Sequence, residues 1–131
     1  MQDKAFRLRS QVEREVTMAE RITLKISPTS IELVGKLVGK PGAIENNDIA
    51  KSTSILICAL MERLERLKNK VEELNISYAD RNYLISVRAT GEMYNQILES
   101  FELVWCGFEL LKAAFPKNIV IDRYEEGKRD G

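Results

Sequence analysis

Residues 21–26 alternate strictly between polar and apolar side chains, and this short pattern restricts the possible folds more than any other feature. The apolar positions are Ile22, Leu24 and Ile26, and the polar positions are Arg21, Thr23 and Lys25. Such alternation is typical of a strand with one buried and one solvent-facing side. A lone strand of this length is unstable in water, so it must pair with another strand of the same chain or of a second copy.

The residues that follow predict a helix. Ser27 and Pro28 are suited to the N-cap and the first helical position, and the chain reaches a Pro-Gly turn shortly after Gly39. Between these points, apolar residues recur at helical spacing, namely Ile31, Val34, Leu37 and Val38. We therefore expect a short helix over residues 28–39, followed by a loop over residues 39–51.

A second, longer helix is predicted after three adjacent N-cap candidates, Ser52, Thr53 and Ser54. Its apolar residues are spaced alternately by three and four positions, at Ile57, Leu60, Leu64, Leu67, Val71 and Leu74. This heptad pattern indicates either packing into a core or pairing with a second copy of the same helix.

The second half of the sequence predicts a β-α-β unit after a polar joint at residues 75–81. Residues 82–89 and 119–124 alternate as strands do, and a long apolar helix is expected over residues 92–115, which Pro116 ends. We assign residues 82–125 to this unit and residues 126–131 to a frayed tail. Aromatic residues in the helix predict core packing, at Phe101, Trp105, Phe108 and Phe115.

The N-terminal segment, residues 1–20, predicts an amphipathic helix from residue 3 onward. Its apolar positions follow helical spacing, at Ala5, Leu8, Val12, Val16 and Ala19. The charged residues between them form a solvated face. This segment is expected to pack on the rest of the fold or on a partner.

Composition excludes several kinds of site. The 131 residues contain no histidine, which removes Ser-His and Cys-His nucleophiles and histidine-liganded metals. Cys58 and Cys106 lie in apolar helical patterns, so we expect buried, reduced thiols and a cytoplasmic location. Carboxylates occur at salt-bridge spacing along helices, and no catalytic pair is evident. We therefore expect no enzyme, no cofactor, no metal and no membrane span.

In the order strand, helix, turn and longer helix, residues 21–74 resemble the ribbon-helix-helix superfamily of DNA-binding proteins, the MetJ/Arc type. The resemblance depends on the alternating strand, the Ser27-Pro28 helix start and the Ser/Thr-rich start of the second helix. The loop between the helices is longer than the family leads us to expect. The implied fold is α+β, a dimeric ribbon-helix-helix half with a C-terminal β-α-β extension.

The resemblance implies a homodimer that inserts a two-stranded ribbon into the major groove of duplex DNA. Arg21, Thr23 and Lys25 would then read bases, and the helix start at Ser52, Thr53 and Ser54 would hold a phosphate. Either a transcriptional repressor or an accessory factor of plasmid transfer or partition would fit. The polar face of an ordinary sheet and plain helix capping explain the same residues without DNA.

A second hypothesis belongs to a different class. Net charge is zero, so long-range attraction to a polyanion is modest. With the long loop and the apolar helix 92–115, this favours a small α+β assembly or adaptor protein that binds protein partners. Helix 92–115 would offer the contact surface. Pairing of strand 21–26 within one chain would support this hypothesis over the dimeric ribbon.

Overall fold

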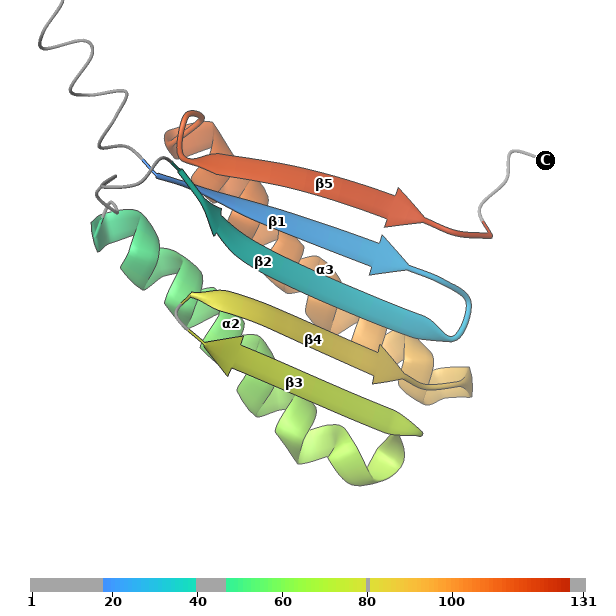
Figure 1. Cartoon of the computed structure of the whole chain (residues 1–131). Helices are drawn as coiled ribbons and strands as arrows, with labels where there is room; N and C mark the ends of the chain where they lie inside the picture. The colour runs from blue at the N-terminus through green and yellow to red at the C-terminus, as the bar shows by residue number, and fades with distance from the viewer. Residues whose placement is uncertain (1–17, 40–46, 80, 128–131) are drawn as a thin grey trace, which may run out of the picture.

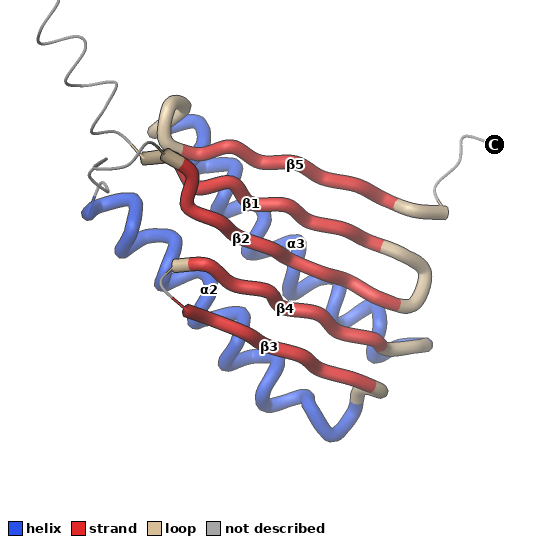
Figure 2. The backbone as a smooth tube through the Cα atoms, in the orientation of Figure 1, coloured by secondary structure: helices blue, strands red, loops and turns tan. Residues whose placement is uncertain are grey.

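The computed structural model describes residues 18–39, 47–79 and 81–127. They form one mixed sheet of five strands with two helices on one face (Figures 1 and 2). The strands are β1 (Ala19–Ile26), β2 (Ser30–Val38), β3 (Glu73–Ala79), β4 (Asn82–Arg88) and β5 (Ile119–Glu125). The helices are α2 (Asn47–Leu67), the short 3₁₀ helix η1 (Lys68–Lys70) and α3 (Gly91–Ala114).

The strand order is β3-β4-β2-β1-β5, and only the β1–β5 pair is parallel. β1 therefore has strands of its own chain on both sides, β2 and β5. The prediction of an intermolecular ribbon is wrong, because both edges of β1 are already paired. The two strands of the expected C-terminal unit, β4 and β5, lie on opposite sides of the β1–β2 hairpin and belong to the same sheet. They do not form a separate extension.

The second strand, β2, replaces the helix predicted over residues 28–39. Ser27 and Pro28 form the hairpin turn instead of a helix start, with Ser27 N donating to Ser30 O at 2.8 Å and Ser30 N donating to Ser27 Oγ at 3.1 Å. Every second residue of β2 from Ile31 to Gly35 faces the helices, namely Ile31, Leu33 and Gly35. The apolar residues of this segment fit both the helical period and the strand period. The segment forms a strand because pairing with β1 provides hydrogen bonds for the backbone groups of both strands.

The first described helix, α2, begins at Asn47, five residues before the predicted Ser52 start. Four residues of the heptad pattern are buried, Ile57, Leu60, Leu64 and Leu67. The last two residues of the pattern, Val71 and Leu74, lie beyond the helix, and Leu74 belongs to β3. The polar joint predicted at residues 75–81 is in fact largely this edge strand and its turn. The heptad residues therefore pack within the chain and do not indicate a helix pair between two copies.

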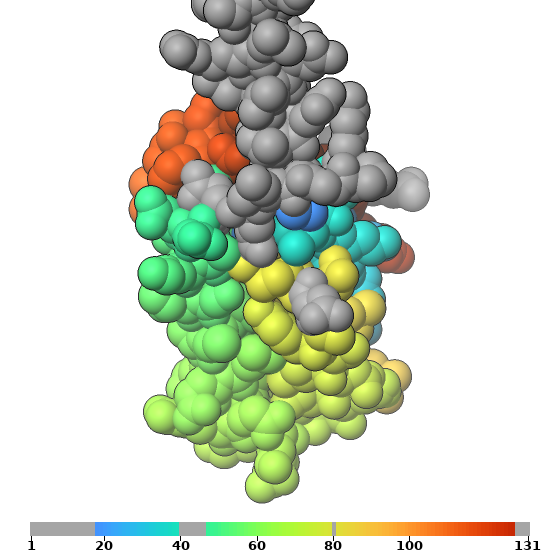
Figure 3. Space-filling view, turned by 60° about the vertical axis from the view of Figure 1, so that its left-hand side comes forward, coloured from blue at the N-terminus to red at the C-terminus, as the bar shows by residue number. Residues whose placement is uncertain are grey.

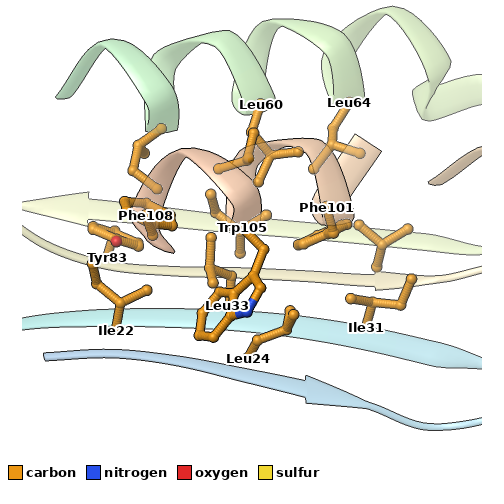
Figure 4. Close-up of a cluster of buried hydrophobic side chains, with 14 of the residues drawn as sticks. Ile22, Leu24, Ile31, Leu33, Leu60, Leu64, Tyr83, Phe101, Trp105 and Phe108 are labelled. Carbon is orange, nitrogen blue, oxygen red and sulfur yellow. The ribbon is translucent and has the colours of Figure 1, made fainter. Parts of the chain in front are cut away.

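The core lies between the sheet and the two helices (Figure 4). Phe101, Trp105 and Phe108 of α3 are buried, as their spacing predicts, and Leu60 and Leu64 of α2 face the same layer. Ile22 and Leu24 supply the sheet side from β1. Of the expected N-terminal helix, Ala19 and Glu20 belong to β1, and residues 1–17 lie outside the described residues. Neither of the described helices is long and apolar enough to cross a membrane.

Candidate functional site

The face of the sheet opposite the helices carries a shallow hollow over β5, β1 and β2. Strand alternation turns Ile22, Leu24 and Ile26 toward the helices, so the polar residues of β1 point to the other face. One part of the hollow, about 470 Å³, is lined by Arg21, Thr23, Lys25, Asp122 and Tyr124. A second part, about 280 Å³, shares Lys25 and Tyr124 and continues over Ser30, Glu32, Ser86 and Glu126. We call these two parts the open-face hollow.

Charges in the hollow are arranged in opposite pairs. Arg21 Nε lies 3.3 Å from Asp122 Oδ2, and Lys25 Nζ lies 3.9 Å from Glu32 Oε2. The side chains of Arg21 and Lys25 are 57% and 60% exposed, whereas those of Asp122 and Glu32 are each 33% exposed. Exposed ion pairs are weak, so an incoming carboxylate can compete for either cation. The hollow suits a partner that carries polar and charged side chains.

The structure brings Arg21, Thr23 and Lys25 together but separates them from Ser52, Thr53 and Ser54. The three hydroxyl residues lie in the second turn of α2, on the helix side of the sheet. Ser52 Oγ donates to Asp48 O at 2.8 Å, and Thr53 Oγ1 lies 3.0 Å from Ile49 O. They do not begin the helix, so they do not supply the free amides that an N-terminal phosphate site requires.

Thr53 belongs to a buried polar cluster at the end of the sheet. Its Oγ1 donates to Glu20 Oε2 at 2.9 Å, and Arg81 Nη2 donates to Glu20 Oε2 at 2.6 Å and to Thr53 Oγ1 at 2.7 Å. Glu20 and Thr53 are 4% and 1% exposed. This cluster connects β1, α2 and the β3–β4 turn, and its burial keeps a ligand away from Thr53. We assign it a structural role.

Tyr83 lies close to this cluster and has a buried hydroxyl for which the described residues offer no hydrogen-bond partner. Burial, and then the neighbouring Glu20 carboxylate, raise the pKa of Tyr83 far above its ordinary value of 10.0. The phenol is therefore neutral at any physiological pH. It cannot serve as a general base.

Sequence reasoning did not identify the residues that complete the open-face hollow, namely Asp122, Tyr124, Glu32 and Ser86. The alternation along residues 119–124 indicated a strand. It did not indicate that this strand would lie beside β1, because the parallel pairing depends on the crossover through α3. The neighbours of Arg21 and Lys25 are therefore set by strand order, which a local pattern does not contain.

Both thiols differ from expectation. Cys58 on α2 and Cys106 on α3 are exposed and are not joined to each other. Apolar residues occur on more than one side of these helices, so an apolar neighbourhood in the sequence did not ensure that either thiol is buried. Among the described residues, no group of three or more cysteine and carboxylate side chains is arranged to hold a metal ion.

Comparison with known proteins gives matches in structure alone. No protein-family model matches the sequence, and neither does any curated protein. The crystal structure of SMU.848 from Streptococcus mutans matches with a TM-score of 0.57 and 19% identity, covering 82% of this chain and 99% of that chain. The ribosomal processing protease Prp from S. aureus, in complex with a substrate peptide, matches with a TM-score of 0.56 and 12% identity, covering 79% and 98%.

This chain shares its fold with SMU.848 and Prp. A hypothetical protein from S. aureus also matches, with a TM-score of 0.50, 10% identity, and coverage of 79% of this chain and 98% of that chain. The resemblance to ribbon-helix-helix proteins is therefore wrong, since that fold has one strand pair per dimer and no five-stranded sheet within a chain. The predictions of a homodimeric DNA-binding regulator and of duplex DNA as its partner are wrong for the same reason.

The comparison also overturns the prediction that the chain is not an enzyme. That prediction depended on the lack of a catalytic pattern in the sequence, yet a protease is built on the same fold. Identity of 12% extends no residue role from Prp to this chain. With no histidine in the sequence, any hydrolysis would have to use groups other than a Cys-His or Ser-His pair.

Proposed function

We propose that this protein binds an extended segment of a protein partner in the open-face hollow, along β1. The observation that carries the proposal is the row Arg21, Thr23 and Lys25, which lines a hollow on a sheet face that the helices leave uncovered. Of the two hypotheses drawn from the sequence, this is the protein-binding one, moved from helix 92–115 to the sheet.

The spacing of the row fits an extended polypeptide. Side chains at alternate positions of a strand lie about 6.6 Å apart, and an extended segment presents its own side chains at the same interval. Two partner carboxylates four positions apart would therefore meet Arg21 and Lys25, with a polar residue between them over Thr23. Tyr124 is 58% exposed beside Lys25 and offers an aromatic surface to an apolar partner side chain.

Similarity to Prp supports a polypeptide as the ligand class. Prp shares the fold and was crystallised with a substrate peptide. Ribosomal proteins are therefore the first source of candidate segments. The free thiols support the cytoplasmic location that the sequence predicts, and we include that location in the proposal.

An array of overlapping short peptides from bacterial ribosomal proteins tests the proposal directly. Each peptide that binds is then measured by fluorescence anisotropy against three proteins. These are the natural chain, the triple variant Arg21→Ala/Thr23→Ala/Lys25→Ala, and the control Lys51→Ala/Ser54→Ala/Arg63→Ala. The control removes two cations and one hydroxyl from α2. We expect the first variant to weaken binding at least about tenfold, or 1.4 kcal/mol, and the control to bind as the natural chain does.

Two designed peptides test the charge pattern. One carries glutamate at two positions four apart in a polar, extended sequence, and the other carries lysine there. The natural chain should prefer the glutamate peptide, and the Arg21→Glu/Lys25→Glu variant should prefer the lysine peptide. Equal binding to both peptides, or full binding by the triple variant, would remove the open-face hollow as the site. Mass spectrometry of the same mixtures reports whether a bound peptide is also cleaved.

A further inference from the structure

One side of α3 exposes large apolar side chains to solvent. Leu103 and Leu110 are 74% and 72% exposed, and Cys106 between them is also exposed. Spacings of three and four residues place all three on one side of the helix, opposite the buried Phe101 and Phe108. We call Leu103, Cys106 and Leu110 the α3 stripe.

Polarity changes along this exposed side of α3. Toward the start of the helix it carries Glu92, Gln96 and Glu99, all exposed. From Leu103 onward it is mainly apolar and continues to Ala113 and Ala114, with the exposed Glu109 at its edge. The apolar surface is thus confined to the C-terminal half of α3, which makes it a patch with a definite position in the fold.

That half of α3 lies beside the point where the N-terminal segment joins the fold. Asn118, shortly after α3, donates from Nδ2 to Met18 O at 3.1 Å, and Glu20 N donates to Asn118 O at 2.8 Å. Lys112 in the last turn of α3 donates to Ile119 O at 3.0 Å. In Figure 3 the orange end of α3 and start of β5 lie at the same end of the molecule as the blue start of β1.

The sequence of the N-terminal segment matches the α3 stripe in spacing. Ala5, Leu8 and Val12 are separated by three and four positions, as Leu103, Cys106 and Leu110 are. Residues 13–17 can extend about 17 Å, which exceeds the diameter of a helix with its side chains, about 10–12 Å. The segment can therefore reach the outer side of α3 from its attachment at Met18.

We propose that residues 3–12 form a helix that packs on the α3 stripe, in the same direction as α3. Ala5, Leu8 and Val12 would cover Leu103, Cys106 and Leu110. This direction brings the basic N-terminal end, with Lys4, toward Glu99 on the polar part of α3. The same packing direction therefore suits both the apolar residues and the charges. This proposal does not depend on the binding function of the open-face hollow.

Cys106 provides a native probe at the centre of the contact. The rate at which iodoacetamide alkylates each thiol is followed by mass spectrometry of the native protein. Cys58 is the internal control, because it lies two positions after Leu56, the residue that contacts α3 at Gly107. Side chains two positions apart on a helix point in nearly opposite directions, so Cys58 faces away from α3.

Three variants decide the result. In the natural chain we expect Cys106 to react about tenfold more slowly than in a chain that lacks residues 1–12, with Cys58 unchanged. Leu8→Asp should restore the fast reaction of Cys106, whereas Ser10→Asp, on the opposite side of the proposed helix, should not. Equal Cys106 rates in the natural and shortened chains would overturn the proposal. Protection that disappears on dilution would assign the stripe to a second copy and overturn it as well.

Discussion

The ring of Tyr83 on β4 lies directly against the backbone of Gly35 on β2, its partner across the two strands. A Cβ atom added to Gly35 would lie 2.1 Å from Tyr83 Cζ and 2.3 Å from Tyr83 Cε1. No side chain fits at this separation. Gly35 is therefore required by the close approach of an aromatic ring, which occupies the space that a side chain of β2 would otherwise fill.

Replacing Gly35 by alanine should destabilise the protein by about 2–3 kcal/mol, because the buried ring must leave its place. Urea unfolding followed by circular dichroism measures the loss. In the Tyr83→Ala background the same substitution should cost much less, since the obstructing ring is gone. Additive effects of the two substitutions would show that Gly35 is needed for another reason.

Replacing Tyr83 by phenylalanine should raise the free energy of unfolding by about 1 kcal/mol at neutral pH. The substitution removes a buried hydroxyl that lacks a partner among the described residues and keeps the ring that packs on Gly35. A lower stability of Tyr83→Phe would mean that the hydroxyl makes a favourable interaction in solution.

The raised pKa of Tyr83 also predicts how stability changes at alkaline pH. The unfolded phenol loses its proton near the ordinary value of 10.0, while burial keeps the folded phenol protonated. Stability linked to this group is thus fully present below about pH 10 and is lost as pH rises above it. Urea midpoints measured between pH 8 and pH 11 should fall less steeply for Tyr83→Phe than for the natural chain.

Local periodicity predicts an element well where one period dominates over a long stretch. α3 spans Gly91–Ala114, close to the predicted 92–115. The prediction succeeded because the apolar residues of this helix fit no strand pattern. The strand at residues 30–38 was not predicted, since Val34, Leu37 and Val38 also fit a helix. Gly35 interrupts the alternation of apolar side chains along β2, because it occupies an inward-facing position and has no side chain. The reason is Tyr83, which is distant in sequence.

The candidate site could be predicted only in part, for a similar reason. Alternation in residues 21–26 correctly indicates a polar outer face with Arg21, Thr23 and Lys25. Their neighbours Asp122 and Glu32 come from strands whose order is decided by the whole sheet. Arg21 and Lys25, each paired with a carboxylate, favour a polypeptide ligand. The same two cations, considered without their carboxylate partners, suggested DNA. The functional interpretation therefore depended mainly on which strands lie side by side in the sheet.

The buried pair of Glu20 and Arg81 should be costly to break. Replacing Arg81 by methionine removes the ion pair that Arg81 Nη2 forms with the buried Glu20 carboxylate at 2.6 Å and should lower the free energy of unfolding by about 3 kcal/mol. The double variant Glu20→Met/Arg81→Met removes both charges and should recover a large part of this loss. Urea unfolding of the two single variants and the double variant measures the coupling. A double variant as unstable as the sum of both single variants would contradict this account.

The ion pair between Arg123 and Glu102 fixes the edge strand β5 to α3 and so positions Asp122 and Tyr124 in the open-face hollow. Arg123 Nη1 and Nη2 donate to the two oxygens of Glu102 at 2.5 and 2.6 Å, and hydrogen bonding to this carboxylate raises the pKa of Arg123. Lysine keeps the charge but cannot form two parallel bonds. Arg123→Lys should therefore destabilise the protein by about 1 kcal/mol and speed amide hydrogen exchange in β5 more than in β4.

The matched control is Arg66→Lys, which alters the exposed pair with Glu62 on α2 and should change stability by less than about 0.5 kcal/mol. Equal effects of the two substitutions would show that the Arg123 pair does not hold β5 in place.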